Sequence, residues 1–263
     1  MKSKKNKSDF NNLSLVVLSS ESYSYLWSNF IRSWNKYCKN LVLDKFIVTT
    51  NKNSNKRNFK IISSSLDKND FWSNRIKYTL KKIKTKNILI FTDDCFVDNF
   101  LDLNHFEKIY RIFKKKNFLH LRLSPIPNEN YFDKKNIYKL DYHSFHRISL
   151  QPGLWNKNYL IKMLSHNETP RQFEENGSKR TKATASIYST NYYVINYKEL
   201  VRIGKITPEG KKLILNEKLN INKKYKYMNI FETCDHYFKK VIGNIFYFFP
   251  KAIRKLYIRQ KYT

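Results

Sequence analysis

Two carboxylates stand side by side directly after an apolar run. In NILIFTDDCF, residues 87–96, Asp93 and Asp94 follow a segment typical of a buried strand. Adjacent carboxylates repel each other, so keeping both ionised calls for a compensating cation, commonly Mg²⁺ or Mn²⁺. Ligands of open parallel sheets bind beyond the carboxyl ends of the strands. The pair is therefore a candidate metal and diphosphate site; otherwise one Asp caps the next segment, or both are solvated in a loop.

Two further polar residues accompany this pair in the predicted topology. Arg75 lies on the helix one element before Asp93, and its planar guanidinium matches the oxygens of a diphosphate. The alternative for Arg75 is a solvent-facing helix charge. Ser19 ends the first strand, where it is placed either to contact the base or ribose of a nucleotide or to cap the next helix. Arg75 and Ser19 are accordingly candidate donor-binding residues.

The elements that must position these residues alternate between strand and helix. Apolar runs predict strands at 13–19, 45–50, 59–63 and 87–92. Apolar residues at three- and four-residue steps predict helices after the first strand and at 70–84 and 105–116. Strands separated by amphipathic helices indicate an α/β fold with a Rossmann-like, mostly parallel sheet flanked by helices.

The charge balance favours anionic partners. Lys and Arg total 51 against 21 Asp and Glu, a formal net charge of +30, which suits nucleotides, nucleic acid or an acidic membrane face. The abundance of Lys, Asn, Ile, Tyr and Phe is also what an AT-rich coding sequence produces by itself, so the charge alone does not choose between partners. The basic residues are scattered through most of the chain.

The cysteines and the lengths of the apolar runs indicate the cellular compartment. Cys38, Cys95 and Cys234 are far apart and odd in number, which indicates neither a disulfide framework nor a zinc site. No run approaches the roughly 20 apolar residues of a membrane span, and LSLVVL is too short for a signal peptide. We expect a cytoplasmic protein.

Five segments carry a resemblance to a known family: LVVLSS, FWSNRIKYTLKKIKTKNILIFTDDCF, LRLSPIP, HRISLQPGLWNKNYLIKML and NETPRQFEENGSKR. Within residues 13–200 they resemble small bacterial glycosyltransferases of the GT-A fold, of the surface-glycan type. The resemblance implies a nucleotide-sugar donor in the first half and an acceptor in the second. It also implies a D-x-D-type motif that meets the ribose and, through Mn²⁺ or Mg²⁺, the diphosphate. TDDCF departs from a strict D-x-D, because Thr92 stands where the first Asp would be if Asp94 is the last.

The second half supplies candidate acceptor and catalytic residues. In QPGLWNK, Gln151 offers amide hydrogen bonds, and Trp155 offers a flat surface for a sugar ring, with a place in the core as its alternative. Inverting sugar transfer requires one general base to take the proton of the acceptor hydroxyl. Glu174 is our candidate, supported by the family's FE motif, with Glu175 in reserve; the alternative is an exposed helix carboxylate.

These patterns divide the chain into three parts. We expect a disordered basic tail over 1–12, a GT-A-like catalytic domain over 13–200 and a helical, basic and aromatic extension over 201–263. The extension could rest on the anionic inner face of a membrane, pack on the domain or support a homodimer. The sequence does not indicate the oligomeric state.

Two function classes follow. In the favoured one, we expect a metal-assisted, inverting glycosyltransferase with a nucleotide-sugar donor and a glycan or lipid-linked acceptor. The alternative is a basic nucleic-acid-binding protein, or a nuclease that uses Asp93 and Asp94 with metal ions. The nucleic-acid class requires a continuous basic groove, whereas the donor site requires positive charge only around one diphosphate.

Overall fold

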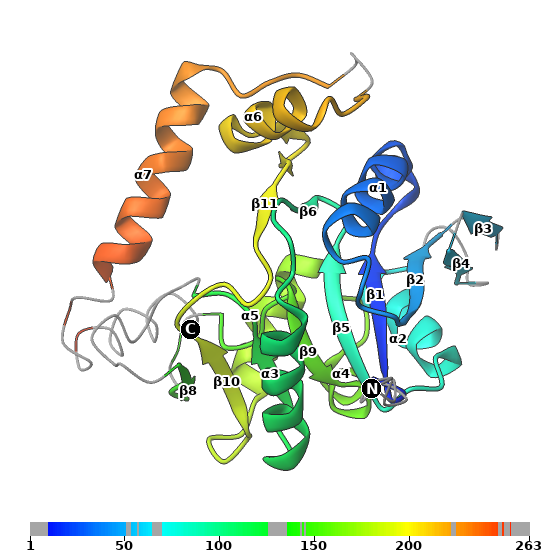
Figure 1. The fold of residues 1–263 in the computed structure, drawn as a ribbon. Coiled ribbons are helices and arrows are strands. Elements are labelled where there is room, and N and C mark those ends of the chain that lie inside the picture. Colours follow the sequence, from blue (N-terminus) through cyan, green and yellow to red (C-terminus); the bar gives the residue numbers. More distant parts are fainter. Residues whose placement is uncertain are drawn as a thin grey trace, which may run out of the picture.

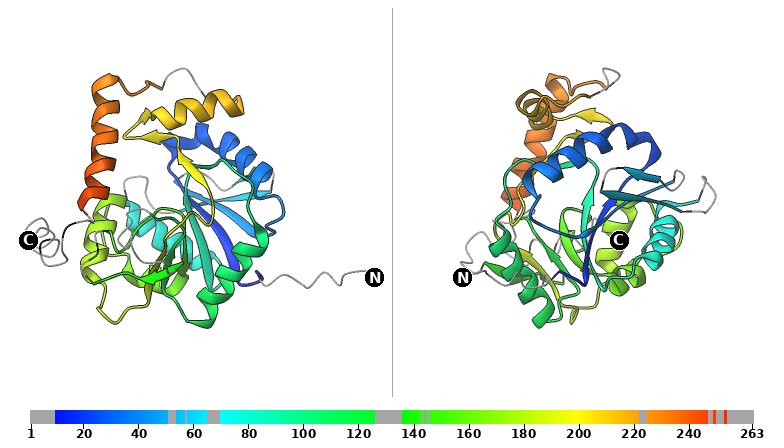
Figure 2. Two further views of the ribbon diagram at one scale, coloured as in Figure 1. Left: turned by 60° about the vertical axis from the view of Figure 1, so that its left-hand side comes forward. Right: turned by 45° about the vertical axis from the view of Figure 1, so that its right-hand side comes forward.

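The computed structural model describes residues 10–50, 54–56, 58–64, 70–125, 136–142, 144, 146–221, 225–246, 249 and 253. Within them a central sheet is covered by helices on both faces (Figures 1 and 2). The sheet has the strand order β3-β4-β2-β1-β5-β9-β7-β10-β8. In its middle β4, β2, β1 and β5 are parallel neighbours, and β7 and β10 form another parallel pair. The prediction of a mostly parallel α/β sheet is confirmed.

The strands of the central sheet are β1 (Leu13–Leu18), β2 (Asp44–Thr49), β3 (Ser54–Lys56), β4 (Phe59–Ser63), β5 (Asn87–Thr92), β7 (His120–Arg122), β8 (Ile137–Lys139), β9 (Gly153–Asn156) and β10 (Ile187–Thr190). Two smaller sheets pair β6 (Cys95–Val97) with β11 (Tyr197–Glu199), and β12 (Val201–Arg202) with β13 (Lys205–Ile206). The helices are η1 (Glu21–Leu26, 3-10), α1 (Trp27–Tyr37), α2 (Trp72–Lys82), α3 (Leu103–Lys115), α4 (Lys157–Met163), α5 (Pro170–Arg180), α6 (Pro208–Glu217) and α7 (Ile230–Phe246).

Alternation along the central strands creates two apolar layers. In β1, Leu15 and Val17 face the layer that also holds the buried residues of α1 and α3, while Val16 and Leu18 face the layer of α2, α4 and α5. All six residues of β1 are buried, as expected for a strand with parallel neighbours and helices on both faces. The sheet therefore forms a rigid middle layer that holds the ends of its strands in place.

The strand order reverses at β1. The chain passes from β1 through β2 to β4 on one side and then crosses through α2 to β5, which pairs with the other side of β1. The carboxyl ends of β1 and β5 lie side by side at this reversal, where Leu18 pairs with Thr92. Open α/β sheets bind their ligands in the crevice at such a switch point.

The antiparallel strand β9 lies between β5 and β7 and was not predicted. Its first residue, Gly153, pairs with Ile90 of β5 and with Arg122 of β7. A Cβ at Gly153 would lie 3.0 Å from the His120 ring and 3.1 Å from the carbonyl oxygen of Leu121. The bare glycine lets the strands approach, so the segment before β9 arrives at the same edge as the ends of β1 and β5.

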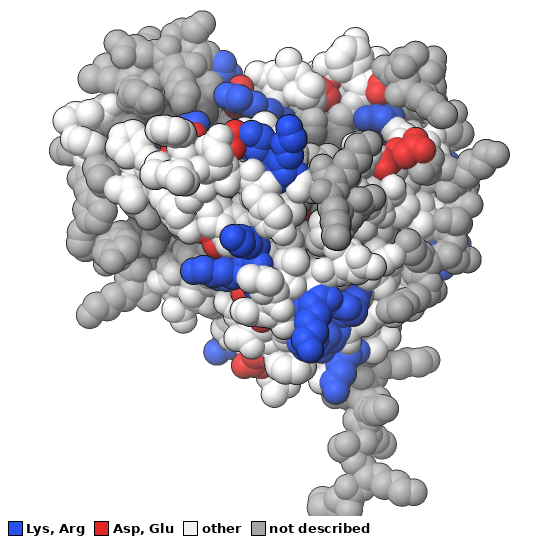
Figure 3. Space-filling view, turned by 90° about the horizontal axis from the view of Figure 1, so that it is seen from above, with Lys and Arg blue, Asp and Glu red and all other residues white. Residues whose placement is uncertain are grey.

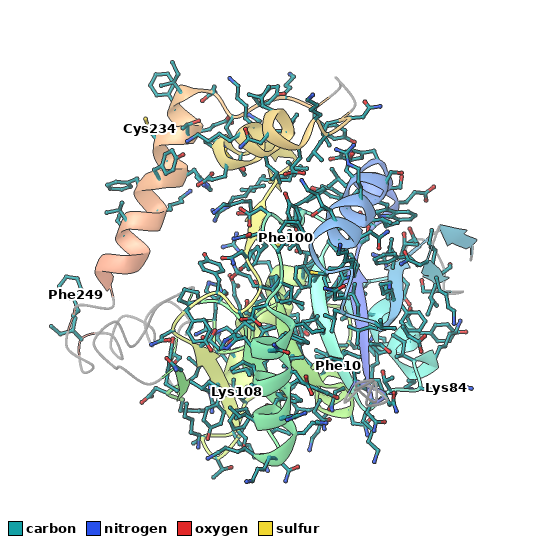
Figure 4. The ribbon with its side chains drawn as sticks, in the orientation of Figure 1. Phe10, Lys84, Phe100, Lys108, Cys234 and Phe249 are labelled. Carbon is teal, nitrogen blue, oxygen red and sulfur yellow. The ribbon has the colours of Figure 1, made fainter. Side chains whose placement is uncertain are left out.

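The amino-terminal boundary differs from the prediction of a disordered tail over 1–12. Phe10 is buried, and its ring packs on Phe106 and Tyr110, with centroids 5.7 Å away in each case. Burial of an aromatic ring compensates the entropy lost by ordering the chain beside it. Residues 1–9 lie outside the described residues. Figure 4 shows Phe10 at the lower end of the sheet, far from the carboxyl edge.

The segment predicted as a helical extension over 201–263 begins with the hairpin β12–β13 and continues through α6 and α7. Gly210 brings α6 against the chain after β11, because its missing side chain leaves room for the carbonyl of Leu200. No helix in the described part of the chain has the length and apolar character needed to cross a membrane. Most of 247–263 lies outside the described residues.

Gly210→Ala tests this packing. The added Cβ would clash with the carbonyl oxygen of Leu200, a backbone atom between β11 and β12 that can move only with the chain around it. We expect a loss of about 1–3 kcal/mol in the free energy of unfolding, measured by urea denaturation. Lys212→Ala, at an exposed position of the same helix, is the matched control and should change stability by less than about 0.5 kcal/mol. Equal effects of the two variants would contradict the close contact.

Candidate active site at the carboxyl edge of the sheet

Asp93 directly follows β5 and lies beside the end of β1. Its backbone N–H donates to the carbonyl oxygen of Leu18 at 3.2 Å, which continues the strand pairing by one residue. Its carboxylate accepts a short hydrogen bond from the hydroxyl of Ser19, and that hydroxyl in turn accepts from the indole Nε1 of Trp27 at 2.7 Å. The chain Trp27, Ser19, Asp93 fixes the carboxylate at the switch point.

Burial makes Asp93 a weak acid. The residue is 6% exposed, and loss of solvent raises the pKa of its carboxyl to about 8, with the nearby charge of Asp94 adding to the rise and the Ser19 hydroxyl opposing it. The pKa of Asp94 is also raised, again chiefly by burial. Asp93 is buried, and Asp94 is half-buried with its Oδ1 buried, so both hold negative charge here only at a cost. A cation that reaches them is bound with favourable electrostatics.

Asp94 has an oxygen that fits a cation. Its Oδ1 is buried and accepts no hydrogen bond from the described residues, which is costly for a carboxylate unless another group compensates it. The described residues hold no cluster of three or more His, Cys, Asp or Glu that could bind a metal. An ion here would draw its other ligands from water and a bound diphosphate, the manner in which Mg²⁺ is commonly held. The donor set of Asp93 and Asp94 fits such an ion.

Stacked tyrosines lie beside the Asp pair, and the sequence analysis missed them. Tyr25 stacks on Tyr225 with ring centroids 3.8 Å apart and on Tyr23 at 6.1 Å. Burial, followed by the charges of Asp94 and Asp93, raises the pKa of Tyr23. The sequence signal was ESYSYL, which was interpreted as part of a long amphipathic helix but forms the 3-10 helix η1. Half-buried rings thus lie beside the Asp pair.

Glu174 belongs to the same edge through the segment before β9. Its Oε1 accepts from the backbone N–H of Leu150 at 2.6 Å and from the hydroxyl of Ser149 at 3.1 Å. Burial raises the pKa of Glu174, and the positive charge of the fully buried Arg122 opposes the rise. These two hydrogen bonds to Oε1 orient the carboxylate at this edge of the sheet.

Gln151 connects the two carboxylate sites. Its side-chain oxygen accepts from the Tyr197 hydroxyl at 2.9 Å. Tyr197 begins β11, whose partner β6 starts at Cys95, directly after the Asp pair, and the backbone N–H of Leu200 donates to the carbonyl oxygen of Asp94 at 2.7 Å. The predicted acceptor residue Gln151, half-exposed, therefore lies between the segments that carry Asp94 and Glu174.

The helix that carries Glu174 is held by an ion pair between Arg180 and the buried Glu168, which the sequence analysis did not single out. Both guanidinium nitrogens of Arg180 contact Glu168, Nη1 at 2.6 Å and Nη2 at 2.8 Å. Glu168 is buried and also bonds the start of α2, where its N–H donates to the Ser73 hydroxyl at 2.9 Å. A bidentate pair of this kind gives geometric specificity and fixes α5 against α2.

The acceptor-stacking role predicted for Trp155 is wrong. The indole is fully buried, and its ring stacks on His120 with centroids 3.7 Å apart. The physical reason is the unforeseen strand β9, which places Trp155 between β5 and β7 and beneath the helix layer. Burial lowers the pKa of His120 to about 3, so the pair is an uncharged part of the core.

Arg75 lies on α2, the helix that leads into β5, but no described contact joins it to Asp93 or Asp94. Burial lowers the pKa of its guanidinium, and Asp70 is the charge that offsets this. Ser19 uses its hydroxyl proton on Asp93, so the structure gives it a positioning contact within the protein. The donor-binding roles of both residues stay predictions.

Figure 3 views the molecule from above, at the edge toward which β1 and β5 run in Figure 1. On this face Lys and Arg gather in separate groups with uncharged surface between them. A nucleic-acid groove requires a continuous basic track, and the described surface of this face does not form one.

No protein-family model and no curated protein sequence matches this chain. Solved structures with a similar arrangement include residues 1–349 of S. aureus TarS, at TM-score 0.43 and 11% identity, covering 68% of this chain and 60% of that chain. The complex of TarS 1–349 with UDP-GlcNAc gives TM-score 0.46 and 12% identity, covering 81% and 68%. A cytidylyltransferase from Leptospira borgpetersenii gives 0.42 and 11%, covering 88% and 96%.

The chain thus spans 60% of the length of the first TarS structure. At these scores and identities the similarities do not specify a reaction or a substrate for this chain. The α/β arrangement with a mostly parallel sheet is established by its own strand order, and the candidate site by its own contacts.

Asp93→Asn should stabilise the protein at alkaline pH. The folded state keeps a proton on Asp93 up to about pH 8, whereas the ordinary value for the unfolded chain is 3.8. The folded state therefore binds more protons between these values, and this residue's contribution to stability falls as pH rises from about 4 to 8. We expect a melting temperature higher by on the order of 5 °C at pH 8.5 and a flatter pH profile, measured by calorimetry.

The matched control is Asp44→Asn, at an exposed carboxylate at the start of β2. It should leave the melting profile within about 1 °C of the parent. A parent profile that is flat between pH 5 and 8.5, or equal shifts in both variants, would contradict the buried protonated state of Asp93.

Proposed function

We propose that this chain is a glycosyltransferase that moves a sugar from a nucleoside-diphosphate donor to the hydroxyl of a glycan or lipid-linked acceptor, with inversion. The observation that carries the proposal is the meeting, at one sheet edge, of a buried Asp pair at the switch point and a separately anchored carboxylate on α5. The proposal is supported by the resemblance in sequence segments over 13–200.

The donor side is assigned to Asp93 and Asp94. Their buried negative charge and the unsatisfied Oδ1 of Asp94 suit Mn²⁺ or Mg²⁺ shared with a diphosphate. A bound ion would supply electrostatic stabilisation of the departing nucleoside diphosphate. The protein's own part is to hold the carboxylates in place, which Ser19 and Trp27 do through their hydrogen bonds.

The acceptor side is assigned to Glu174 and Gln151. In the reaction the acceptor oxygen forms a bond to the anomeric carbon, the bond from that carbon to the diphosphate breaks, and the hydroxyl proton passes to Glu174. Burial raises the pKa of Glu174, which makes it a better base than an exposed carboxylate. Its anchored Oε1 keeps Oε2 oriented, and the amide nitrogen of Gln151 is available to orient the acceptor.

Donor binding is tested by calorimetric titration of the purified protein with UDP and with GDP, each with and without Mn²⁺. We expect one of the two to bind with metal present, and Asp94→Asn to weaken that binding at least tenfold, because it removes the charge of the buried carboxylate. Asp98→Asn, at a half-buried carboxylate four residues on that pairs with Lys198, is the control and should bind as the parent does.

Other outcomes separate the alternatives. Binding of single-stranded nucleic acid but of neither nucleotide, with affinity that falls steeply with salt, would replace the proposal by the nucleic-acid class. Turnover of a nucleoside triphosphate with a sugar phosphate, releasing pyrophosphate, would instead assign a nucleotidyltransferase, the class to which the Leptospira cytidylyltransferase belongs.

Glu174→Gln should separate binding from chemistry. The amide keeps the shape of the side chain but cannot take a proton, so we expect transfer to fall by at least 10² while the nucleotide dissociation constant changes less than threefold. Glu175→Gln is the control, because Glu175 pairs with Arg171 on the outside of the same helix. Transfer that survives in Glu174→Gln would remove Glu174 from the mechanism.

A further inference from the structure

Helix α7 turns its polar side toward the protein. Asn229 and Glu232 cap its start reciprocally, each backbone N–H donating to the other side chain at 2.9 Å. Glu232 also pairs with Lys205 of β13. One turn on, His236 is buried, with Nδ1 3.3 Å from Arg202 and Nε2 3.3 Å from Glu209 of α6. Polar contacts thus attach the helix to the body.

The opposite side of α7 is apolar and exposed. Its exposed residues of this kind repeat at steps of three, four and seven: Ile230, Phe231, Cys234, Tyr237, Phe238, Val241 and Ile242. At 3.6 residues per turn these positions fall within an arc of about 140°. Ile230 and Phe231 are 80% and 85% exposed. We call this set the outer stripe.

The pictures agree with this orientation. α7 lies at the periphery of the molecule in Figures 1 and 2, and in Figure 4 Cys234 projects from the side of the helix that faces away from the body. A helix on a globular protein ordinarily buries its apolar face and exposes its polar one. The arrangement of α7 is the reverse, and no described part of the chain covers the outer stripe, which marks it as a contact surface.

Charge indicates the kind of partner. After Asp235 the sequence contains seven Lys and Arg and no Asp or Glu, and aromatic residues continue through FYFFP and LYI. Two of the seven, Lys239 and Lys240, belong to α7, and the other five lie outside the described residues. The chain as a whole carries +30, so a second copy would bring like charge to the contact. An amphipathic helix with aromatic residues on its apolar face and neighbouring Lys and Arg suits an anionic bilayer surface.

We propose that α7 lies in the plane of an anionic lipid bilayer, with the outer stripe inserted among the acyl chains and Lys and Arg at the headgroups. The 17 residues of α7 extend about 25 Å along the surface. α7 contacts β13 and α6. α6 packs on β11, and β11 pairs with β6, the strand that begins directly after the Asp pair. The bilayer would therefore lie beside the carboxyl edge of the sheet. This inference rests on the outer stripe and on the Lys and Arg that follow Asp235 in the sequence, independent of the proposed transfer reaction.

The experiment is co-sedimentation of the full chain with vesicles of phosphatidylcholine alone and with 30% phosphatidylglycerol. We expect binding to the anionic vesicles that exceeds binding to neutral ones at least tenfold and that weakens at 0.5 M NaCl. The double variant Phe231→Glu with Phe238→Glu should lose this binding at least tenfold. The control is a double variant with the same added charge, Val42→Glu with Leu215→Glu, at exposed apolar positions outside α7. It should lose much less of the vesicle binding.

Light scattering of the same proteins completes the test. The parent is expected to keep its molar mass over a hundredfold range of concentration, and circular dichroism should show that the double variant retains its helix content. The proposal is overturned if the protein binds anionic and neutral vesicles alike, or if the control loses as much binding as the double variant. It is also overturned if the parent is a dimer, the double variant is a monomer, and neither protein binds vesicles.

Discussion

The burial of Asp93 and Asp94 where β1 and β5 end is the constraint on which the rest of this structure depends. Carboxylates in such a place destabilise the fold unless neighbours hold them and a counter-charge arrives. The neighbours come from two segments: Ser19 and Trp27, after β1, hold the Asp93 carboxylate, and Leu200, directly after β11, bonds the backbone carbonyl of Asp94. The two carboxylates thus lower the stability of the fold at the position where the strand order reverses. Local destabilisation of this kind is typical of functional sites.

The long elements of the fold, whose apolar residues repeat at a regular spacing, could be predicted from the sequence. The strands at Leu13–Leu18 and Asn87–Thr92 and the helix at Trp72–Lys82 agree with the predictions to within a few residues, because each is long enough to show its apolar spacing. The placement of Asp93 at a strand end followed from the same pattern. Its pairing with Ser19 did not, because that contact joins residues 74 positions apart.

The missed parts are short or depend on distant partners. The strand at Gly153–Asn156 has four residues, too few to show an alternation, and only its pairing with two neighbours makes it a strand. The assignment of Trp155 to the surface failed for this reason. Glu174 was selected from its sequence context. Its hydrogen bond from Leu150 and the ion pair between Glu168 and Arg180 form only once α5 has packed, so the sequence did not reveal them.

The outer stripe also contains the chain's single exposed cysteine. Of the three cysteines, Cys38 and Cys95 are buried and Cys234 is exposed. Burial raises the pKa of Cys38 to about 12 and raises that of Cys95 as well, and the thiolate is the form that reacts with electrophiles. A maleimide dye would therefore label the native chain at Cys234 alone, which gives a fluorescent reporter of polarity on this face without any engineering of the sequence.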